Sequence, residues 1–201
     1  MDIQKIAMFG GSFNPVHNAH IKLTQKIKEV INPDLILAIP TFTTPLKDNS
    51  SMVSADHRLN MCKLAWSSQP FVKVSDIEIT RGGKSYTADT LEILQSQYPN
   101  ARLYLIVGAD MFMSVQDWYR PDKIFKIATL VVAPRDKTDY KILSNHSKFL
   151  QKFGAESIVL ADAIMELSST FIRDSIKSGA DVSDFLPANV LEYIGQNNLY
   201  R

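Results

Sequence analysis

The stretch Gly10-Gly11-Ser12-Phe13-Asn14-Pro15-Val16-His17-Asn18-Ala19-His20 directly follows a short apolar run at residues 6–9. This order predicts a strand that breaks on two glycines, turns through Asn-Pro and restarts as a helix, whose N-terminal N–H groups can bind phosphate. His17 and His20 are three residues apart, so we expect both imidazoles to face the mouth made by the glycines. The two glycines alone could be a tight turn, and the two histidines alone could be a metal-binding pair or surface residues. Together, the glycine pair and the histidine pair indicate a site for the polyphosphate of a nucleotide, without a Walker lysine.

The bulk composition fits one ordinary domain, residues 1–201. Apolar residues make up 45% of the chain, which is enough for a core. A balance of 22 basic and 21 acidic residues gives no reason to expect a nucleic acid or an anionic membrane as partner. We expect a cytoplasmic protein, because neither a leader nor a run long enough to span a bilayer is seen.

A single cysteine, Cys62, excludes an intramolecular disulfide and a cysteine-only zinc site. Because it lies in a helical pattern, we expect it to be a small buried hydrophobe. His57 and Arg58, in the first turn of the same predicted helix, are interpreted as solvated residues and not as ligands.

Alternating patterns of strands and helices predict an α/β fold. The predicted strands are 3–9, 35–39, 72–79 with an interruption, 103–107, 130–133 and 157–160. The predicted helices are 18–30, 54–68, 88–97 with Ser85 or Thr87 as cap, short pieces within 112–126, 140–153, one ending near 178, and 188–197. The opening strand, helix and strand imply a right-handed crossover and a parallel sheet.

Three segments after predicted strands are candidates for function, because loops at the carboxyl edge of a parallel sheet commonly bind ligands. The loop 41–54 carries Lys47. Gly108 and Asp110 follow the strand 103–107, where a ligand could approach closely and a carboxylate could bind hydroxyls, or the Asp could cap a helix. Trp118, with its aromatic neighbour, would be either a core lid or a surface that stacks on a flat ring.

A second candidate for anion binding is the segment Leu167-Ser168-Ser169-Thr170-Phe171-Ile172-Arg173. Hydroxyl residues at a helix start leave N–H groups pointing outward, and Arg173 adds a fork of donors that suits phosphate. A plain helix cap looks much the same. We expect this segment to form one site with residues 10–20, because both would lie at carboxyl ends of strands in one sheet.

These motifs carry a family resemblance. GGSFNPVHNAH resembles the (G/T)xFxPxHxxH signature of the nucleotidylyltransferase superfamily, and LSSTFIR resembles its ISSTxxR signature. GGKSYTADTL, IVGADMF and Trp118 resemble the bacterial nicotinate-nucleotide adenylyltransferase family in particular. The resemblance covers essentially the whole chain in the correct order. It implies a Rossmann-like, doubly wound parallel sheet with a small helical C-terminal part, and transfer of AMP from ATP to nicotinate mononucleotide in NAD synthesis.

The resemblance also implies roles for individual residues. The ATP site would be formed by Gly10, Gly11, Ser12, Phe13, Gly108, Asp110, Ser169 and Thr170. The catalytic residues that hold the phosphates would be His17, His20 and Arg173. The acceptor nucleotide would meet Lys47, Tyr86, Thr87, Trp118 and, less securely, Arg135. Mg²⁺ would enter on the phosphates of ATP, so no metal bound by the protein itself is expected.

Two positions depart from the family pattern. Leu46 replaces a histidine that commonly precedes the loop lysine, so that histidine is dispensable or the acceptor pocket differs. Ala19 replaces a usual glycine, a small change at a helical position.

Several alternatives stay open from the sequence. A related adenylyltransferase could prefer nicotinamide mononucleotide, since only the groups that meet the carboxylate separate the two acceptors. Phosphopantetheine enzymes are shorter and lack the SYTADT block, and a class I aminoacyl-tRNA synthetase would need a tRNA-binding domain. A nucleotide-binding module without catalysis would not require both histidines and Arg173. The oligomeric state is open.

Overall fold

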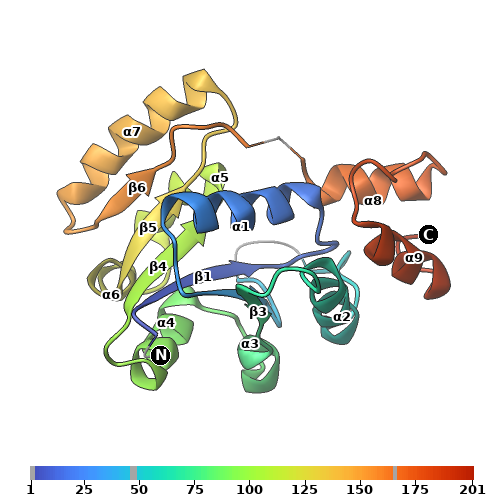
Figure 1. Cartoon of the computed structure of the whole chain (residues 1–201), viewed down its shortest axis with the longest axis horizontal. Helices are drawn as coiled ribbons and strands as arrows, with labels where there is room; N and C mark the ends of the chain where they lie inside the picture. Colours follow the sequence, from blue (N-terminus) through green and yellow to red (C-terminus); the bar gives the residue numbers. More distant parts are fainter. Residues whose placement is uncertain (1–2, 46–48, 165–166) are drawn as a thin grey trace.

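The computed structural model describes residues 3–45, 49–164 and 167–201. In these ranges a six-stranded sheet has the order β3-β2-β1-β4-β5-β6, and every neighbouring pair is parallel (Figure 1). The strands are β1 (Lys5–Gly11), β2 (Leu35–Pro40), β3 (Val72–Val74), β4 (Arg102–Val107), β5 (Ala128–Val132) and β6 (Ser157–Val159). The predicted α/β fold with a doubly wound parallel sheet is confirmed.

Helices cover both faces of this sheet (Figure 1). They are α1 (Asn18–Val30), α2 (Ala55–Ala65), α3 (Ile77–Arg81), α4 (Thr87–Gln97), α5 (Ala109–Phe112), the 3-10 helix η1 (Val115–Asp117), α6 (Pro121–Ile127), α7 (Lys137–Gln151), α8 (Ser169–Lys177) and α9 (Ala188–Gln196). Within the described ranges, every helix is too short or too polar to span a bilayer.

Two apolar cores lie on the two faces, because successive side chains of a strand point to opposite sides. In β1, Ala7 and Phe9 pack with residues of α1, α2 and α9, whereas Ile6 and Met8 pack with residues of α4, α6 and α7. Cys62, fully buried in the first core, is the small buried hydrophobe that its helical pattern predicts.

The point where the strand order reverses lies between β1 and β4. Pairing of β1 with β4 ends at Phe9 and Ile106, but pairing with β2 continues for two residues to Gly11 and Pro40. The prediction that β1 breaks at the glycines is therefore wrong: the strand includes both. Beyond Phe9 it is paired on one side only, so a gap opens toward β4. Ligands of open parallel sheets bind at such a point.

The predicted strand 72–79 is also wrong in its second half. β3 ends at Val74, and the chain turns at Asp76 into α3, where the N–H of Thr80 donates to the carbonyl of Asp76 at 2.8 Å. Apolar residues alternate on both sides of this turn, at 72 and 74 and again at 77 and 79, so the sequence resembles one interrupted strand.

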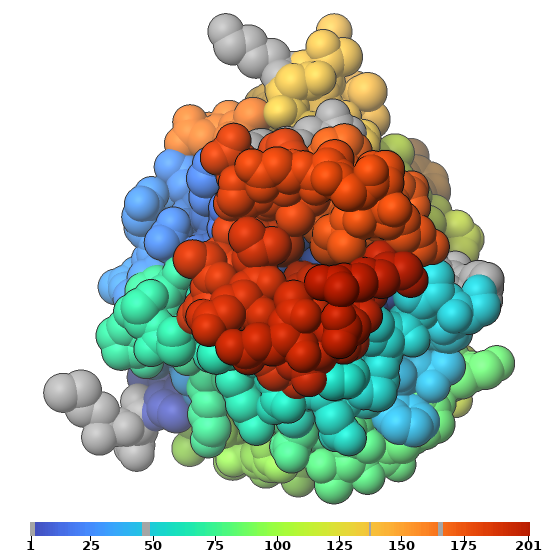
Figure 2. Space-filling model, turned by 90° about the vertical axis from the view of Figure 1, so that its right-hand side faces the viewer, coloured from blue at the N-terminus to red at the C-terminus, as the bar shows by residue number. Residues whose placement is uncertain are grey.

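The C-terminal segment closes one end of the molecule. Figure 2 shows it, in orange and red, packed beside the residues of α2. The Tyr200 hydroxyl donates to Oδ1 of Asn14 at 2.9 Å, and both residues are buried. The end of the chain is thus hydrogen-bonded to the turn that follows β1.

Candidate active site

Two adjoining cavities lie over the carboxyl ends of β1 and β4. The larger, about 460 Å³, is lined by His17, His20, Arg173 and the start of α8; the smaller, about 200 Å³, is lined by residues of α4 and the segment around η1. Both are lined by Gly10, Gly11, Ser12, Thr44, Val107, Gly108 and Met111. The shared wall lies at the switch point, where β1 and β4 part.

The histidine pair lies as the spacing predicts, side by side at the start of α1. The two rings stack with centroids 3.6 Å apart, and both residues line the larger cavity. Nδ1 of His20 accepts the backbone N–H of His17 at 3.1 Å, so a neutral His20 carries its proton on Nε2.

Burial keeps both imidazoles uncharged. It lowers the pKa of His17 to about 4. The pKa of His20 is held well below its usual value by burial and, second, by the neighbouring His17. At neutral pH the pair therefore offers N–H donors and not positive charges.

A further part of the lining of the larger cavity comes from α8, far along the chain. Arg173 donates through Nη1 to the carbonyl of Asn14 at 2.9 Å and through Nη2 to the Thr170 hydroxyl at 3.2 Å. The Ser169 hydroxyl donates to the carbonyl of Pro15 at 2.8 Å. The two sequence motifs are thus joined by direct hydrogen bonds, and the residues predicted for phosphate binding lie in one cavity.

The helix-start N–H groups are less available than the sequence predicts. The N–H of His17 donates to His20, and the N–H of Asn18 donates to the carbonyl of Phe185 at 2.9 Å. Side chains therefore make up more of the phosphate-facing surface at α1 than we expected.

The end of β4 leaves open space beside the glycines of β1. A Cβ atom added to Gly108 would have no atom of the described chain within 4 Å. Asp110 projects from the same turn, and one of its oxygens lies 3.4 Å from Nη2 of Arg135. Both line the larger cavity, so Arg135 lies among the residues predicted for ATP and not among those predicted for the acceptor.

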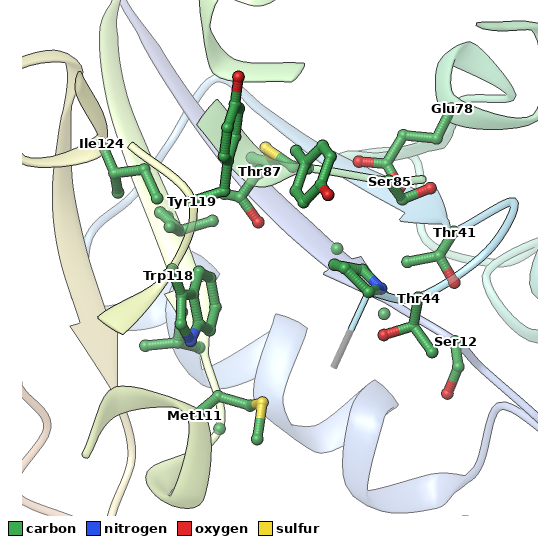
Figure 3. Close-up of a pocket in the computed structure, with 18 of the residues that line it drawn as sticks. Ser12, Thr41, Thr44, Glu78, Ser85, Thr87, Met111, Trp118, Tyr119 and Ile124 are labelled. Atoms are coloured by element: carbon green, nitrogen blue, oxygen red, sulfur yellow. The ribbon is translucent and has the colours of Figure 1, made fainter. Parts of the chain in front are cut away.

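The smaller cavity is aromatic. Figure 3 shows Trp118 and Met111 across the pocket from Ser85 and Thr41. Tyr86 and Tyr119 pair with ring centroids 4.3 Å apart, and Thr87 begins α4, so the positive end of that helix points to this cavity. A flat ring and a negative group would both fit here.

The buried polar atoms that lack a partner gather at the two cavities. In the described part of the chain they are His17 Nδ1, Thr41 Oγ1, Glu78 Oε2, Arg81 Nη2 and Trp118 Nε1. All but Arg81 belong to residues that line a cavity. Because unpaired buried polar groups cost stability, these atoms mark where a ligand would supply partners.

Several lining residues are absent from the predicted site, namely Thr41, Thr44, Glu78, Ser85 and Met111. Thr41 and Thr44 lie in the loop after β2, which the sequence marks as a candidate for function, but only Lys47 of that loop is predicted to bind a ligand. Lys47 and its neighbour Leu46 lie outside the described residues. Neither predicted cap of α4 is confirmed: Tyr86 is the N-cap residue, and the Ser85 hydroxyl instead accepts the N–H of Phe42 at 2.9 Å.

Arg58 corrects a further expectation, because it is buried and not solvated, with 1% of its surface exposed. Its guanidinium donates to the backbone carbonyls of Ser12, Thr41, Phe42 and Val53. It thereby ties the turn after β1 to the loop after β2. His57 is partly exposed and contacts the Tyr193 hydroxyl, with Nδ1 at 3.0 Å.

The described residues hold no group of three or more His, Cys, Asp or Glu side chains that could bind a metal ion. Besides the carboxylate of Asp110, the larger cavity presents two imidazoles, several hydroxyls and the guanidiniums of Arg135 and Arg173. The imidazoles, hydroxyls and guanidiniums can donate to phosphate oxygens.

Comparison with known proteins agrees with this geometry. Residues 8–175 match the model of the cytidylyltransferase-like family, and the chain belongs to this family of nucleotidyltransferases. A relative from Lachnoclostridium phytofermentans is 34% identical over 199 residues, 98% of this chain and 100% of the relative. A relative from Clostridium tetani is 34% identical over 200 residues, which cover 99% of this chain and 100% of the relative. Both are named "Probable nicotinate-nucleotide adenylyltransferase". Together with them the chain forms part of that family, as the sequence motifs imply.

Solved structures support the fold. The Plasmodium falciparum nicotinic acid mononucleotide adenylyltransferase complexed with NaAD superposes with a TM-score of 0.76 at 20% identity, covering 98% of this chain and 97% of that one. The same enzyme complexed with APC gives 0.75 at 20% identity, again over 98% and 97%.

Proposed function

We propose that this chain transfers AMP from ATP to nicotinate mononucleotide and so forms deamido-NAD and pyrophosphate in NAD biosynthesis. The observation that carries this is the shared wall of the two cavities. A nucleotide bound in each would bring its phosphates to Gly10, Gly11 and Gly108, where a bond between them can form. The full-length relatives of the same family carry the name of this activity.

The larger cavity is assigned to ATP. The N–H groups of His17 and His20 would donate to the triphosphate from one side, and Arg173, held by Asn14 and Thr170, from the other. Asp110 would accept from ribose hydroxyls. ATP enters as its Mg²⁺ complex, because the donors that line the cavity suit phosphate oxygens better than a hard cation.

The reaction needs no base from the protein. The acceptor phosphate is largely ionised at neutral pH, since the second pKa of a phosphate ester is about 6. One of its oxygens attacks the α-phosphorus of ATP, a new P–O bond forms, and the bond to the bridging oxygen breaks with its electron pair on pyrophosphate. The protein then acts by aligning two anions and by stabilising charge that develops on the leaving group.

The smaller cavity is assigned to the acceptor. The rings of Trp118 and Tyr86 would hold the pyridine, and the positive end of α4 at Thr87 favours a carboxylate over a neutral amide. The unpartnered Nε1 of Trp118 adds a donor. We therefore expect nicotinate mononucleotide to be preferred over nicotinamide mononucleotide.

The test is pyrophosphate release from ATP with each acceptor, with a reaction lacking acceptor as control. The expected result is a kcat/KM at least tenfold higher for the nicotinate form, about 1.4 kcal/mol. A preference for the amide would overturn the acceptor assignment. ATP binding without turnover on either acceptor would instead favour a non-catalytic module.

A further inference from the structure

A buried carboxyl group lies in the wall of the acceptor cavity and has no part in the reaction described above. Glu78, on α3, has 2% of its surface exposed and lines the smaller cavity. Its Oε1 accepts the Thr90 hydroxyl at 2.7 Å, and Nη1 of Arg81 donates to the same hydroxyl oxygen at 3.0 Å. These three residues are called the Arg81–Thr90–Glu78 trio.

The trio acts on the first turn of α4. Thr90 is fully buried, and its N–H donates to the carbonyl of Tyr86 at 3.2 Å. The turn is also held from the other side, where the N–H of Ser85 donates to the carbonyl of Thr43 at 2.9 Å. Tyr86 and Thr87, which form the acceptor wall, thus lie between the loop after β2 and the trio. Figure 3 shows Glu78 on the Ser85 side of the pocket.

Stability of the fold does not account for a carboxyl group at this place. Burial raises the pKa of Glu78, against the opposing hydroxyls of Thr90 and Ser85 and the charge of Arg81. Its Oε2 has no partner in the described chain, nor has Nη2 of Arg81. A buried polar network that is only partly satisfied is costly, so a role in binding explains this network better than stability does.

We propose that Glu78 is a positioning residue for the acceptor nucleotide: through Thr90 it fixes the first turn of α4, and with it Tyr86 and Thr87, against the pyridine ring. The inference rests on the proposed function, because it deepens the assignment of the smaller cavity. The residue does not touch the reacting atoms.

The experiment compares Glu78→Ala, Thr90→Val, the double variant and Glu78→Gln. Calorimetry gives the Kd of nicotinate mononucleotide and of ATP, and steady-state rates give both KM values. Glu156→Gln is the matched control, because Glu156 forms a similar trio with Thr129 and Arg102 at the opposite end of the sheet. Thr90→Val keeps the shape of the side chain and serves where Glu78→Ala does not fold.

We expect Glu78→Ala and Thr90→Val each to raise the Kd of nicotinate mononucleotide about tenfold and to change the Kd of ATP less than twofold. The double variant should be no worse than Thr90→Val, since that variant already removes the link to Glu78 together with the 3.3 Å contact between the Thr90 hydroxyl and the Tyr86 carbonyl. Glu78→Gln should restore binding, because its amide oxygen can still accept from Thr90, and Glu156→Gln should match the wild type.

Equal weakening of both nucleotides, or a lower melting temperature with unchanged acceptor Kd, would overturn the inference and leave a structural role only. Failure of the proposed function gives a different result. In that case the wild-type chain would release no pyrophosphate, and the Kd comparison of the variants would still decide for or against positioning.

Discussion

His17 is a buried histidine with a ring nitrogen that is available to a ligand. It is 4% exposed, and its Nδ1 has no partner among the described residues. Since a phosphate would supply the missing partner, we expect His17→Ala to lower kcat at least tenfold, about 1.4 kcal/mol of transition-state stabilisation, with the fold kept. The check is kcat beside the melting temperature, with His57→Ala as a histidine control. An unchanged rate would remove His17 from the mechanism.

The pKa of His17 also predicts how stability depends on pH. The folded chain protonates His17 only near pH 4, whereas the unfolded chain does so near the ordinary value of about 6.5. Between these values the unfolded state binds more protons, so the contribution of His17 to the free energy of unfolding is complete above pH 6.5 and is lost as the pH falls toward 4.

Urea unfolding between pH 4.5 and 7.5 measures this loss. The limiting slope for one group is about 1.4 kcal/mol per pH unit. We expect His17→Asn to flatten the curve over that window, although His20 contributes in the same direction. Parallel curves for the wild type and the variant would contradict the assigned pKa.

Single charged residues were the hardest to place from sequence. Arg58 lies in a helical pattern whose first turn resembles a solvated surface, and Glu78 lies between two isoleucines. Their partners are loop carbonyls and a threonine in the next helix, 12 residues from Glu78. Whether such a charge is buried depends on tertiary neighbours, which local patterns do not contain.

At the scale of elements, the segment between η1 and α6 brings Trp118 against the acceptor cavity. We expect Trp118→Ala to raise the KM of nicotinate mononucleotide at least tenfold and that of ATP less than twofold, because the indole lines only the smaller cavity. Steady-state kinetics with each substrate varied in turn measures both. Equal effects on the two substrates would make Trp118 a structural lid.

Most elements could be predicted because buried parallel strands and amphipathic helices leave strong patterns. α1 begins and ends at the predicted residues. The errors lie where tertiary contacts decide. β1 continues through its glycines because β2 keeps pairing with them, and the chain leaves β2 after Val74 to form α3 although β2 itself continues to Pro40. The residues of an edge strand do not by themselves determine how far it stays paired with its neighbour.

At the scale of the whole molecule, the two cavities share one wall, so the dinucleotide product should occupy both. Gly108→Val places a branched side chain at their junction, where the described chain leaves space. We expect Gly108→Val to raise the Kd of both deamido-NAD and ATP at least tenfold, whereas Trp118→Ala should raise the Kd of deamido-NAD alone. Calorimetry measures each Kd.

Gly195→Ala is the matched control for this prediction, because a Cβ atom there also has no described atom within 4 Å and α9 lines neither cavity. Unchanged deamido-NAD binding in either Gly108→Val or Trp118→Ala would mean that the product does not span the junction.

The sequence could predict that the motifs at residues 10–20 and 167–173 meet, because both end up at the same edge of a parallel sheet. It could not predict the contacts that join them, such as Arg173 with the carbonyl of Asn14, nor the division into two cavities. The roles of the individual site residues stay predictions until the variants are measured.

The hydrogen bond between Asn14 and Tyr200 joins residues 186 positions apart in the sequence. Oδ1 of Asn14 also accepts the N–H of Val53 at 3.2 Å, and its Nδ2 donates to the carbonyl of Ser51 at 3.0 Å. One amide side chain therefore fastens two distant segments to the turn that lines the larger cavity. A substitution at Asn14 would release both segments at once, so its effect on this cavity should exceed the loss of any one of these hydrogen bonds.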